Sequence, residues 1–277
     1  MTTARTTQSA VEDLTSPAYW DGVWQKKDGR SWADLTWMRG NYPWFALDRL
    51  LRRSLTARPG ARFLEVGCAS GKWLTYFHRT FGYAVTGCDY SATGCEIAQQ
   101  SLDAAGIRGA VLNQDLFTLA GTWDVVFSAG LIEHFDRPET VLAKFATLLQ
   151  PDTGTLVTLV PNLGGLSGLY HRRLKPETFE THRLITPEHL IGWHRDLGFR
   201  QVAVGAFGSI VPARFPRDKV RRAHPGLNRL LWPLFLRPAT AVTNRLCIMA
   251  SRRLGLQVES PRFSPYLFAI ARDRRGG

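Results

Sequence analysis

Between residues 61 and 207, short apolar runs alternate with longer segments of helical periodicity. An apolar run bounded by glycine or polar residues indicates a buried strand, and apolar positions three or four residues apart indicate an amphipathic helix. The strands expected on this basis are residues 61–67, 84–89, 109–114, 123–129, 154–160, 200–207 and 266–271. The helices expected between them are residues 71–80, 92–105, 138–149 and 187–197. This alternation predicts an α/β fold with a mostly parallel sheet and helices on both faces.

Two segments lie outside this alternation. Residues 1–56 are rich in aromatic side chains and are expected to form a helical cap on the sheet, with a flexible start. Residues 209–264 separate the last two strands as a basic helical insertion, in which Pro238 could begin a helix that runs to Gly255. The chain is therefore divided into the cap, a core (57–208), the insertion and a last strand with a tail (265–277).

The segment FLEVGCASGKW, from Phe63 to Trp73, carries the most information about function. A buried strand ends in Glu65, and a turn bracketed by glycines then enters a helix, so the backbone of the turn can approach a ligand closely. About twenty residues later, the next strand ends in Asp89. A carboxylate at that place can accept both hydroxyls of a ribose, which predicts a nucleoside-type cofactor at the carboxyl ends of neighbouring strands.

The spacing of the glycines argues against the two common phosphate-binding loops. A dinucleotide fingerprint needs G-x-G-x-x-G, and the turn here reads G-C-A-S-G without a central glycine. In a P-loop the lysine comes one residue later, and Ser or Thr follows it where this chain has Trp73. What remains is a ligand that has a ribose and no phosphate for the turn to hold.

At this point the sequence resembles the class I S-adenosylmethionine-dependent methyltransferases, in particular ubiquinone-biosynthesis-like and natural-product members. The motifs that carry the resemblance, in order, are FLEVGCASG, VTGCDYS, NQDLF, WDVVFSAGLIEHFDRPETVL and PDTGTLVTLVPN. They cover roughly residues 55–208, and the resemblance resumes at 266–273. It implies a Rossmann-like, seven-stranded sheet in the order 3-2-1-4-5-7-6 with the last strand antiparallel, and S-adenosyl-L-methionine as the cofactor.

The resemblance also implies which residues hold the cofactor. They belong to the glycine turn and to the ends of the second, third and fourth strands: Glu65, Gly67, Cys68, Ala69, Ser70, Gly71, Asp89, Tyr90, Asp115, Leu116, Ala129 and Gly130. Other roles stay open at this stage. The turn could be an ordinary junction between strand and helix, Asp89 could cap the helix that follows it, and Asp115 could be a turn residue.

His134 and His182 are the catalytic candidates. A methyl group on a sulfonium is already electrophilic, so the protein mainly aligns the acceptor, excludes water and removes a proton. Histidine suits the last task near neutral pH. His134 follows the fourth strand in the Glu-His pair and is the first candidate; the alternative is that the pair only shapes the cofactor loop. His182 is the second, and a structural hydrogen bond to its loop is the alternative.

The acceptor pocket is expected at the same edge of the sheet. Its candidate residues are Trp20, Trp24, Glu133, Asn162, Tyr170 and His171. The two tryptophans could form a lid of large apolar area, or could instead pack in the core. No metal is predicted, because no acidic cluster beyond Glu133 and Asp136 occurs near these strand ends.

The net charge of +12 is concentrated in one segment. Residues 212–277 contain 14 basic and 3 acidic residues, a net of +11, and the rest of the chain is nearly balanced. Three interpretations are open: a solvated cationic face, contact with a membrane surface or a lipid-linked substrate, and nucleic acid. The chain shows no recognised RNA-binding module, which makes nucleic acid the least favoured partner.

The remaining features point to a cytoplasmic protein. The cysteines show no C-x-x-C pair or zinc spacing, and read as small apolar residues in a reducing compartment: Cys68, Cys88, Cys95 and Cys247. The N-terminal residues lack the apolar stretch of a signal peptide, and no stretch of about 18 apolar residues could span a membrane.

The resulting prediction is methyl transfer to a small molecule, with oxygen preferred over nitrogen as the acceptor atom. The resemblance implies a bacterial secondary metabolite, a sugar or a lipid-linked precursor as the acceptor. One alternative is an RNA-directed or non-catalytic binding protein on the same scaffold. An NAD(P)-dependent oxidoreductase is disfavoured, because the central glycine and a Tyr-x-x-x-Lys helix are both missing. The oligomeric state stays open.

Overall fold

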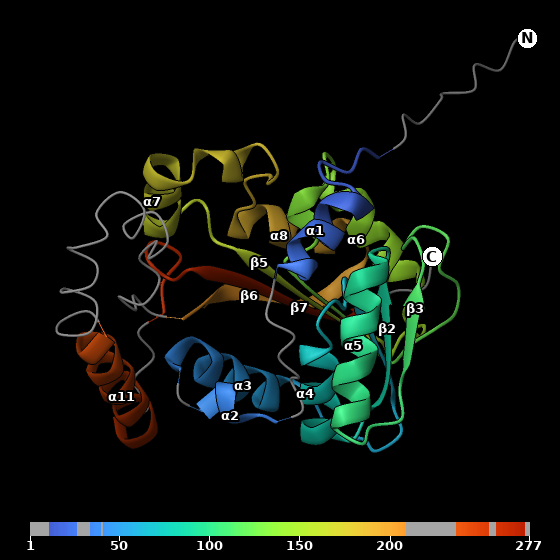
Figure 1. Ribbon diagram of the computed structural model, residues 1–277, viewed down its shortest axis with the longest axis horizontal. Coiled ribbons are helices and arrows are strands. Elements are labelled where there is room, and N and C mark those ends of the chain that lie inside the picture. Colours follow the sequence, from blue (N-terminus) through green and yellow to red (C-terminus); the bar gives the residue numbers. More distant parts are fainter. Residues whose placement is uncertain (1–10, 27–33, 40, 209–236, 255–258, 275–277) are drawn as a thin grey trace, which may run out of the picture.

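The computed structural model describes residues 11–26, 34–39, 41–208, 237–254 and 259–274, and its centre is a sheet (Figure 1). Within these residues the sheet has seven strands in the order β3-β2-β1-β4-β5-β7-β6. The strands are β1 (Arg62–Val66), β2 (Ala84–Asp89), β3 (Ala110–Asn113), β4 (Val125–Ala129), β5 (Thr155–Pro161), β6 (Phe199–Phe207) and β7 (Tyr266–Arg274). Strands β1 to β5 run parallel, and β7 is antiparallel to both β5 and β6. The predicted fold and strand order are confirmed.

The register of the central strands brings the predicted motifs to one edge. β1 lies between β2 and β4, with Val66 opposite Cys88 and Ser128. Because the three strands are parallel, their carboxyl ends meet at the same edge of the sheet. The glycine turn after β1 therefore lies beside Asp89 at the end of β2 and Ala129 at the end of β4.

Both faces of the sheet are covered, as the side-chain period of two requires. Phe63 belongs to the apolar cluster on one face, which is covered by α3 (Tyr42–Ser54), α4 (Lys72–Phe81) and α5 (Ala92–Ala104). Its neighbour Leu64 belongs to the cluster on the other face, which is covered by α6 (Pro138–Thr147) and α8 (Pro187–Asp196) (Figure 1). Both residues are fully buried, so the strand is apolar on both sides.

The turn from β1 into α4 has a left-handed backbone at three positions: Gly67 (φ 76°), Ser70 (φ 79°) and Gly71 (φ 67°). A Cβ atom on Gly71 would lie 2.7 Å from the carbonyl oxygen of Ala98 in α5. Only glycine lets the turn approach α5 this closely in that conformation. The close packing fixes the turn at the carboxyl edge of the sheet.

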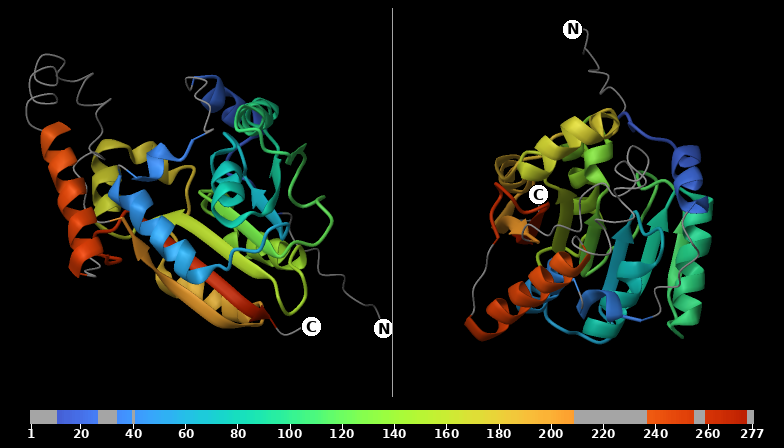
Figure 2. Two further views of the ribbon diagram at one scale, coloured as in Figure 1. Left: turned by 90° about the horizontal axis from the view of Figure 1, so that it is seen from below. Right: turned by 60° about the vertical axis from the view of Figure 1, so that its left-hand side comes forward.

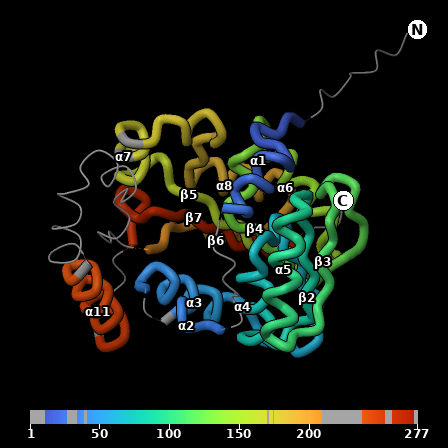
Figure 3. The backbone as a smooth tube through the Cα atoms, viewed as in Figure 1, coloured from blue at the N-terminus to red at the C-terminus, as the bar shows by residue number. Residues whose placement is uncertain are grey.

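The aromatic N-terminal segment contributes to two places. α1 (Pro17–Gln25) packs against α5, whereas α2 (Thr36–Arg39) lies beside α3. α3 in turn contacts β6 and α11 (Arg237–Leu254), far from α1, as the tube in Figure 3 shows. α1 therefore covers the sheet edge, and α2 and α3 cover a face of the sheet.

The chain between β4 and β6 contains the remaining short elements. η1 (Ile132–His134) follows β4, and β5 leads through α7 (Leu166–Leu174) and η2 (Pro176–Phe179) into α8. α8 is capped by Thr186, whose hydroxyl oxygen accepts from the His189 amide, with Pro187 in the first turn. Among the described residues, no helix combines the length and apolar character needed to cross a bilayer.

Of the basic insertion, the structure describes residues 237–254 and 259–264. The helix expected from Pro238 to Gly255 is present as α11. Residues 209–236 and 255–258 of the insertion lie outside the described residues.

Candidate active site

A cavity of about 1150 Å³ opens at the carboxyl edge of the sheet, between the glycine turn and α1. Most of the predicted cofactor residues line it: Glu65, Gly67, Ala69, Ser70, Asp89, Tyr90, Asp115, Leu116, Ala129 and Gly130. Cys68 is buried beside the cavity, and Gly71 is the residue before α4; neither lines it. The turn and the three strand ends thus face one common space.

Glu65 presents an unpaired carboxylate atom at this cavity. The side chain is buried, and its Oε2 atom has no hydrogen-bond partner. Burial raises the pKa of Glu65 well above its usual range, and the nearby Asp89 carboxylate raises it further. A buried carboxylate atom without a partner is costly, and a ligand ammonium group would provide one. The amino group of S-adenosylmethionine fits this requirement.

Asp89 is fixed at the end of β2 by two backbone amides. Its Oδ2 atom accepts from the Ala69 amide at 3.0 Å, and Oδ1 accepts from the Ser91 amide at 2.9 Å. The cap of α5 is Ser91, whose hydroxyl oxygen accepts from the Gly94 amide at 3.0 Å. Because Ser91 serves as the cap, the remaining lone pairs of Asp89 are available to the hydroxyls of a ribose.

The segment after β3 forms the apolar end of the cavity. Leu116 and Phe117 line it, and Phe117 lies edge-on to Phe135 with ring centroids 6.0 Å apart. Asp115 does act in the turn, because its Oδ1 atom accepts from the Phe117 amide at 2.8 Å. Its other oxygen can still accept from a ligand amine. A flat ring between apolar side chains, with an acceptor at its edge, suits an adenine.

A lysine enclosed by tryptophans borders the cavity and was missed by the sequence analysis. The ammonium of Lys72 lies 3.9 Å from the ring centres of both Trp37 and Trp44, and 4.7 Å from that of Trp73. Each contact is of the cation–π type. The rings come from α2, α3 and α4, so only their spacing in the folded chain reveals the cluster.

The segment before and within α1 is fastened over the cavity by polar contacts. The Tyr90 hydroxyl donates to Asp13 at 2.8 Å, and the Trp20 indole donates to the Thr15 hydroxyl at 3.0 Å. Asp21 accepts from the Ser91 hydroxyl at 2.6 Å. These contacts hold α1 across the end of β2. Asp13 and Thr15 also line the cavity, a role that the sequence did not indicate.

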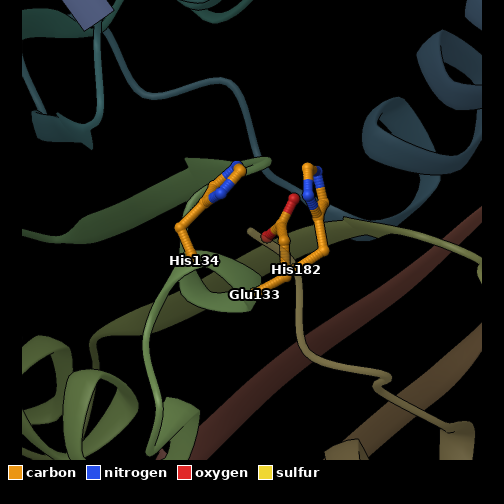
Figure 4. Close-up of side chains that lie close together, drawn as sticks. All are labelled: Glu133, His134 and His182. Atoms are coloured by element: carbon orange, nitrogen blue, oxygen red, sulfur yellow. The ribbon is translucent and has the colours of Figure 1, made fainter. Parts of the chain in front are cut away.

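The two catalytic candidates lie side by side next to Glu133 (Figure 4). The imidazole rings of His134 and His182 have centroids 4.2 Å apart. The Nδ1 atom of His134 is 2.7 Å from the carbonyl oxygen of Thr181. A carbonyl only accepts, so Nδ1 carries the proton and Nε2 of the neutral ring is a free base. Trp20 covers the His134 ring edge-on at 5.1 Å.

Burial keeps both histidines neutral. It lowers the pKa of His134, and it lowers the pKa of His182 to about 4, with a further contribution from the neighbouring His134. Burial also raises the pKa of Glu133 to about 8, and its Oε2 atom has no hydrogen-bond partner. The group therefore combines two neutral imidazoles with a carboxyl that is mostly protonated near neutral pH.

The same three side chains could hold a metal ion. Their candidate ligand atoms all lie within 4.8 Å of one another. The sequence did not indicate this arrangement, because His182 arrives from the segment after η2. One ion with bonds of about 2.1 Å needs its ligand atoms within about 4.2 Å of one another.

The other predicted acceptor residues have different positions. Trp24 lines the cavity and stacks on Trp20, with ring centroids 6.3 Å apart. The Asn162 amide donates to the carbonyls of Pro261 (2.6 Å) and Ser264 (2.7 Å), so it fastens the segment before β7 and does not line the cavity. His171 also lies outside the cavity lining. The side chain of Tyr170 lies outside the described part of the chain.

Comparisons with known proteins show which family the chain is similar to. The family model described as a methyltransferase domain matches residues 38–204. The ubiquinone biosynthesis O-methyltransferase of Escherichia coli O127:H6 is 28% identical over 146 residues, which are 48% of this chain and 60% of that relative. The chain therefore spans less than two thirds of that relative's length.

Two solved structures share the fold at low identity. One is the complex between the Haloferax volcanii Trm112 methyltransferase activator and the putative methyltransferase, with a TM-score of 0.59, 17% identity and coverage of 96% of this chain and 99% of that chain. The other is Haemonchus contortus phosphoethanolamine N-methyltransferase 2 with phosphomonomethylethanolamine and S-adenosylhomocysteine, with a TM-score of 0.57, 17% identity and coverage of 94% and 61%.

Proposed function

This chain belongs to the class I S-adenosylmethionine-dependent methyltransferase family, and on that premise we propose that it methylates an oxygen atom of a small molecule. The observation that carries the proposal is the pairing of two sites at one edge of the sheet. Glu65 on β1 and Asp89 at the end of β2 place carboxylates on the cavity wall. The His134–His182 pair does not line the cavity but lies against Trp20, which does, and it would supply the base.

Each part of the cavity fits one part of the cofactor. Glu65 would accept from the ammonium of the methionine moiety, and Asp89 would accept from the ribose hydroxyls. Asp115, Leu116 and Phe117 would hold the adenine ring by one polar edge and two apolar surfaces. When bound, the cofactor supplies an electrophilic methyl group, and the protein's own task is to align the acceptor and exclude water.

His134 is the proposed base. Its Nδ1 proton is held by the Thr181 carbonyl, so Nε2 can take the proton of an acceptor hydroxyl. Burial lowers the pKa of His134, which keeps it in the basic form at neutral pH. His182 would bind the acceptor or share the proton, since its ring lies against that of His134. Trp20 and Trp24 would form the wall that closes this site to water.

The class of acceptor follows from the same features. A base beside the cavity favours a hydroxyl, because a neutral amine needs no proton removed before it attacks. The relatives named ubiquinone biosynthesis O-methyltransferase support oxygen as the acceptor atom and a lipid-linked precursor as one acceptor class. Biosynthesis of a bacterial secondary metabolite in the cytoplasm is the setting that we propose.

A transfer assay tests this function. Purified protein is incubated with methyl-labelled S-adenosylmethionine and a panel of phenolic, sugar and amine acceptors, and labelled products are identified by mass spectrometry. We expect O-methylated products that His134→Ala lowers by about a hundredfold. Exclusive N-methylation, or full turnover of His134→Ala across the pH range, would contradict the proposed base.

A further inference from the structure

The exposed apolar side chains gather on two helices at one end of the molecule. Within the described residues, seven large apolar side chains are exposed, and five of them lie on α7 or α11. These five, with exposures of 42% to 63%, are Leu166, Leu169, Val242, Leu246 and Met249. Figures 1 and 2 show both helices at the same end of the protein, away from α5 and β3.

α11 attaches to the protein through its polar side. The Asn244 side chain accepts from the Tyr42 amide at 3.0 Å, and the Ser251 hydroxyl accepts from Arg49 at 2.5 Å. Asn244 and Ser251 are buried, at 8% and 4% exposure, whereas Leu246 is 57% exposed. An ordinary surface helix buries its apolar stripe, whereas α11 buries these two polar side chains and leaves Val242, Leu246 and Met249 exposed.

The outward side of α11 has the pattern of an interfacial helix. Val242, Leu246, Met249 and Arg253 follow one another at spacings of four, three and four residues, so they share one face of the helix. Arg245 is exposed beside this stripe. The helix sequence contains no acidic residue. An apolar stripe flanked by arginines, without acids, fits the boundary between anionic headgroups and acyl chains.

α7 repeats this pattern at the same end. Leu166 and Leu169 are exposed, as are Arg172 and Arg173 one turn later, and this helix also lacks acidic residues. Two helices separated in sequence thus present the same combination of aliphatic and cationic side chains. Nucleic acid would be attracted by the arginines, but most of its hydrogen bonds with proteins go to phosphate and sugar, which give aliphatic side chains little to contact.

We propose that α7 and α11 form a surface that docks the protein on anionic lipid bilayers. Binding would bury the aliphatic side chains among acyl chains while the arginines meet lipid phosphates. The charge of the two helices supports this partner, because their sequences hold arginines and no acidic residue. The docking does not depend on the methyl-transfer chemistry, although the chain that leaves α7 leads through η2 to His182.

Vesicle sedimentation tests the docking with the full chain. The probes are vesicles of phosphatidylcholine alone and of phosphatidylcholine with phosphatidylglycerol, at low and high salt. We expect binding to the anionic vesicles only, weakened by salt. Leu246→Gln with Met249→Gln should lower the affinity by about tenfold or more. Arg245→Gln and Arg253→Gln should each lower it about fivefold.

The control is Arg108→Gln, an exposed arginine between α5 and β3, far from this end of the protein. It should bind vesicles as the wild type does. Thermal melting and S-adenosylhomocysteine binding should be unchanged in every variant, which separates a failure of docking from a failure of the proposed function. The proposal is overturned if the wild type does not bind anionic vesicles or if the α11 variants bind them as tightly as the wild type. It is also overturned if the free protein is a dimer that these variants abolish.

Discussion

The imidazole rings of His134 and His182 lie 4.2 Å apart, although one follows β4 and the other follows η2. Thr181 joins the two histidines. Its carbonyl oxygen accepts from Nδ1 of His134, and its hydroxyl oxygen lies 3.0 Å from Nδ1 of His182. Both rings are neutral at physiological pH, with one ring nitrogen of His134 left as a base. Neither histidine lines the cofactor cavity, but Trp20, whose ring lies edge-on to that of His134, does.

The first prediction concerns pH. The pKa of His134 is lowered, so its basic form persists below the usual value of 6.5, and kcat/KM should fall only as the pH drops through this lowered value. His134→Gln should lower the plateau by about a hundredfold and remove this acidic limb. The exposed His189→Gln, which is on α8, is the matched control and should keep the profile. A wild-type profile with its midpoint above 7 would exclude a neutral buried histidine as the base.

Glu133 should destabilise the protein as the pH rises. Burial raises its pKa to about 8, so the folded state holds a proton that the unfolded state loses near 4.5. The stabilisation that the protonated Glu133 carboxyl gives the folded state is therefore fully present below pH 4.5 and is lost progressively up to pH 8. Glu133→Gln should raise the unfolding free energy by about 3 kcal/mol near pH 7, because each pKa unit corresponds to about 1.4 kcal/mol. Denaturant unfolding at pH 5 and pH 8 measures this, and an equal change at both values would refute it.

Glu65→Gln should have opposite effects on stability and on cofactor binding. The unpaired buried carboxylate destabilises the free protein, so the amide should raise the melting temperature. The same change removes the partner of the ligand ammonium, so S-adenosylhomocysteine should bind about tenfold more weakly or worse. Differential scanning fluorimetry with and without the ligand separates the two effects. A variant that loses stability and keeps affinity would show that Glu65 is purely structural.

The lysine among three tryptophans should stabilise the contact between α4 and the N-terminal helices. Lys72→Met retains most of the apolar volume and removes the ammonium, so it should cost about 1 to 2 kcal/mol of unfolding free energy. Lys144→Met is the comparison, because it removes an ammonium that donates to the Leu119 carbonyl at 2.7 Å. Equal losses of unfolding free energy in both variants would show that the three tryptophan rings around Lys72 have no special role.

Chelation distinguishes proton removal from metal chemistry at Glu133, His134 and His182. If the histidines act as neutral bases, treatment with a chelator should leave turnover unchanged, and added Zn²⁺ or Co²⁺ should not raise it. Loss of activity with the chelator, restored by one divalent ion and absent in His182→Ala, would show that the cluster binds a metal ion instead.

The sequence was sufficient for the sheet and for the placement of Gly67 and Asp89 at one edge of it. Apolar runs and punctuating glycines located each strand, and the distance from Gly67 to Asp89 placed both at one edge, because parallel neighbours end together. The proximity of His134 to His182, the enclosure of Lys72 and the outward apolar face of α11 depend on packing between distant segments. Periodicity alone reports that a helix has two faces and not which face is covered.

Asn162 shows the same limit at a single residue. Its position after β5 made it a candidate for acceptor binding, yet its amide donates to two carbonyls of the segment before β7. A polar residue at a strand end can satisfy buried backbone groups as well as a ligand, and only the folded partners decide between these roles.

Isothermal titration calorimetry with S-adenosylhomocysteine tests the central claim most directly. The account predicts that the wild type binds one ligand per chain, and that Asp89→Ala binds about a hundredfold more weakly while it still melts cooperatively. No heat with the wild type, equal heat from both proteins, or binding of NADH or RNA in place of this ligand would contradict it.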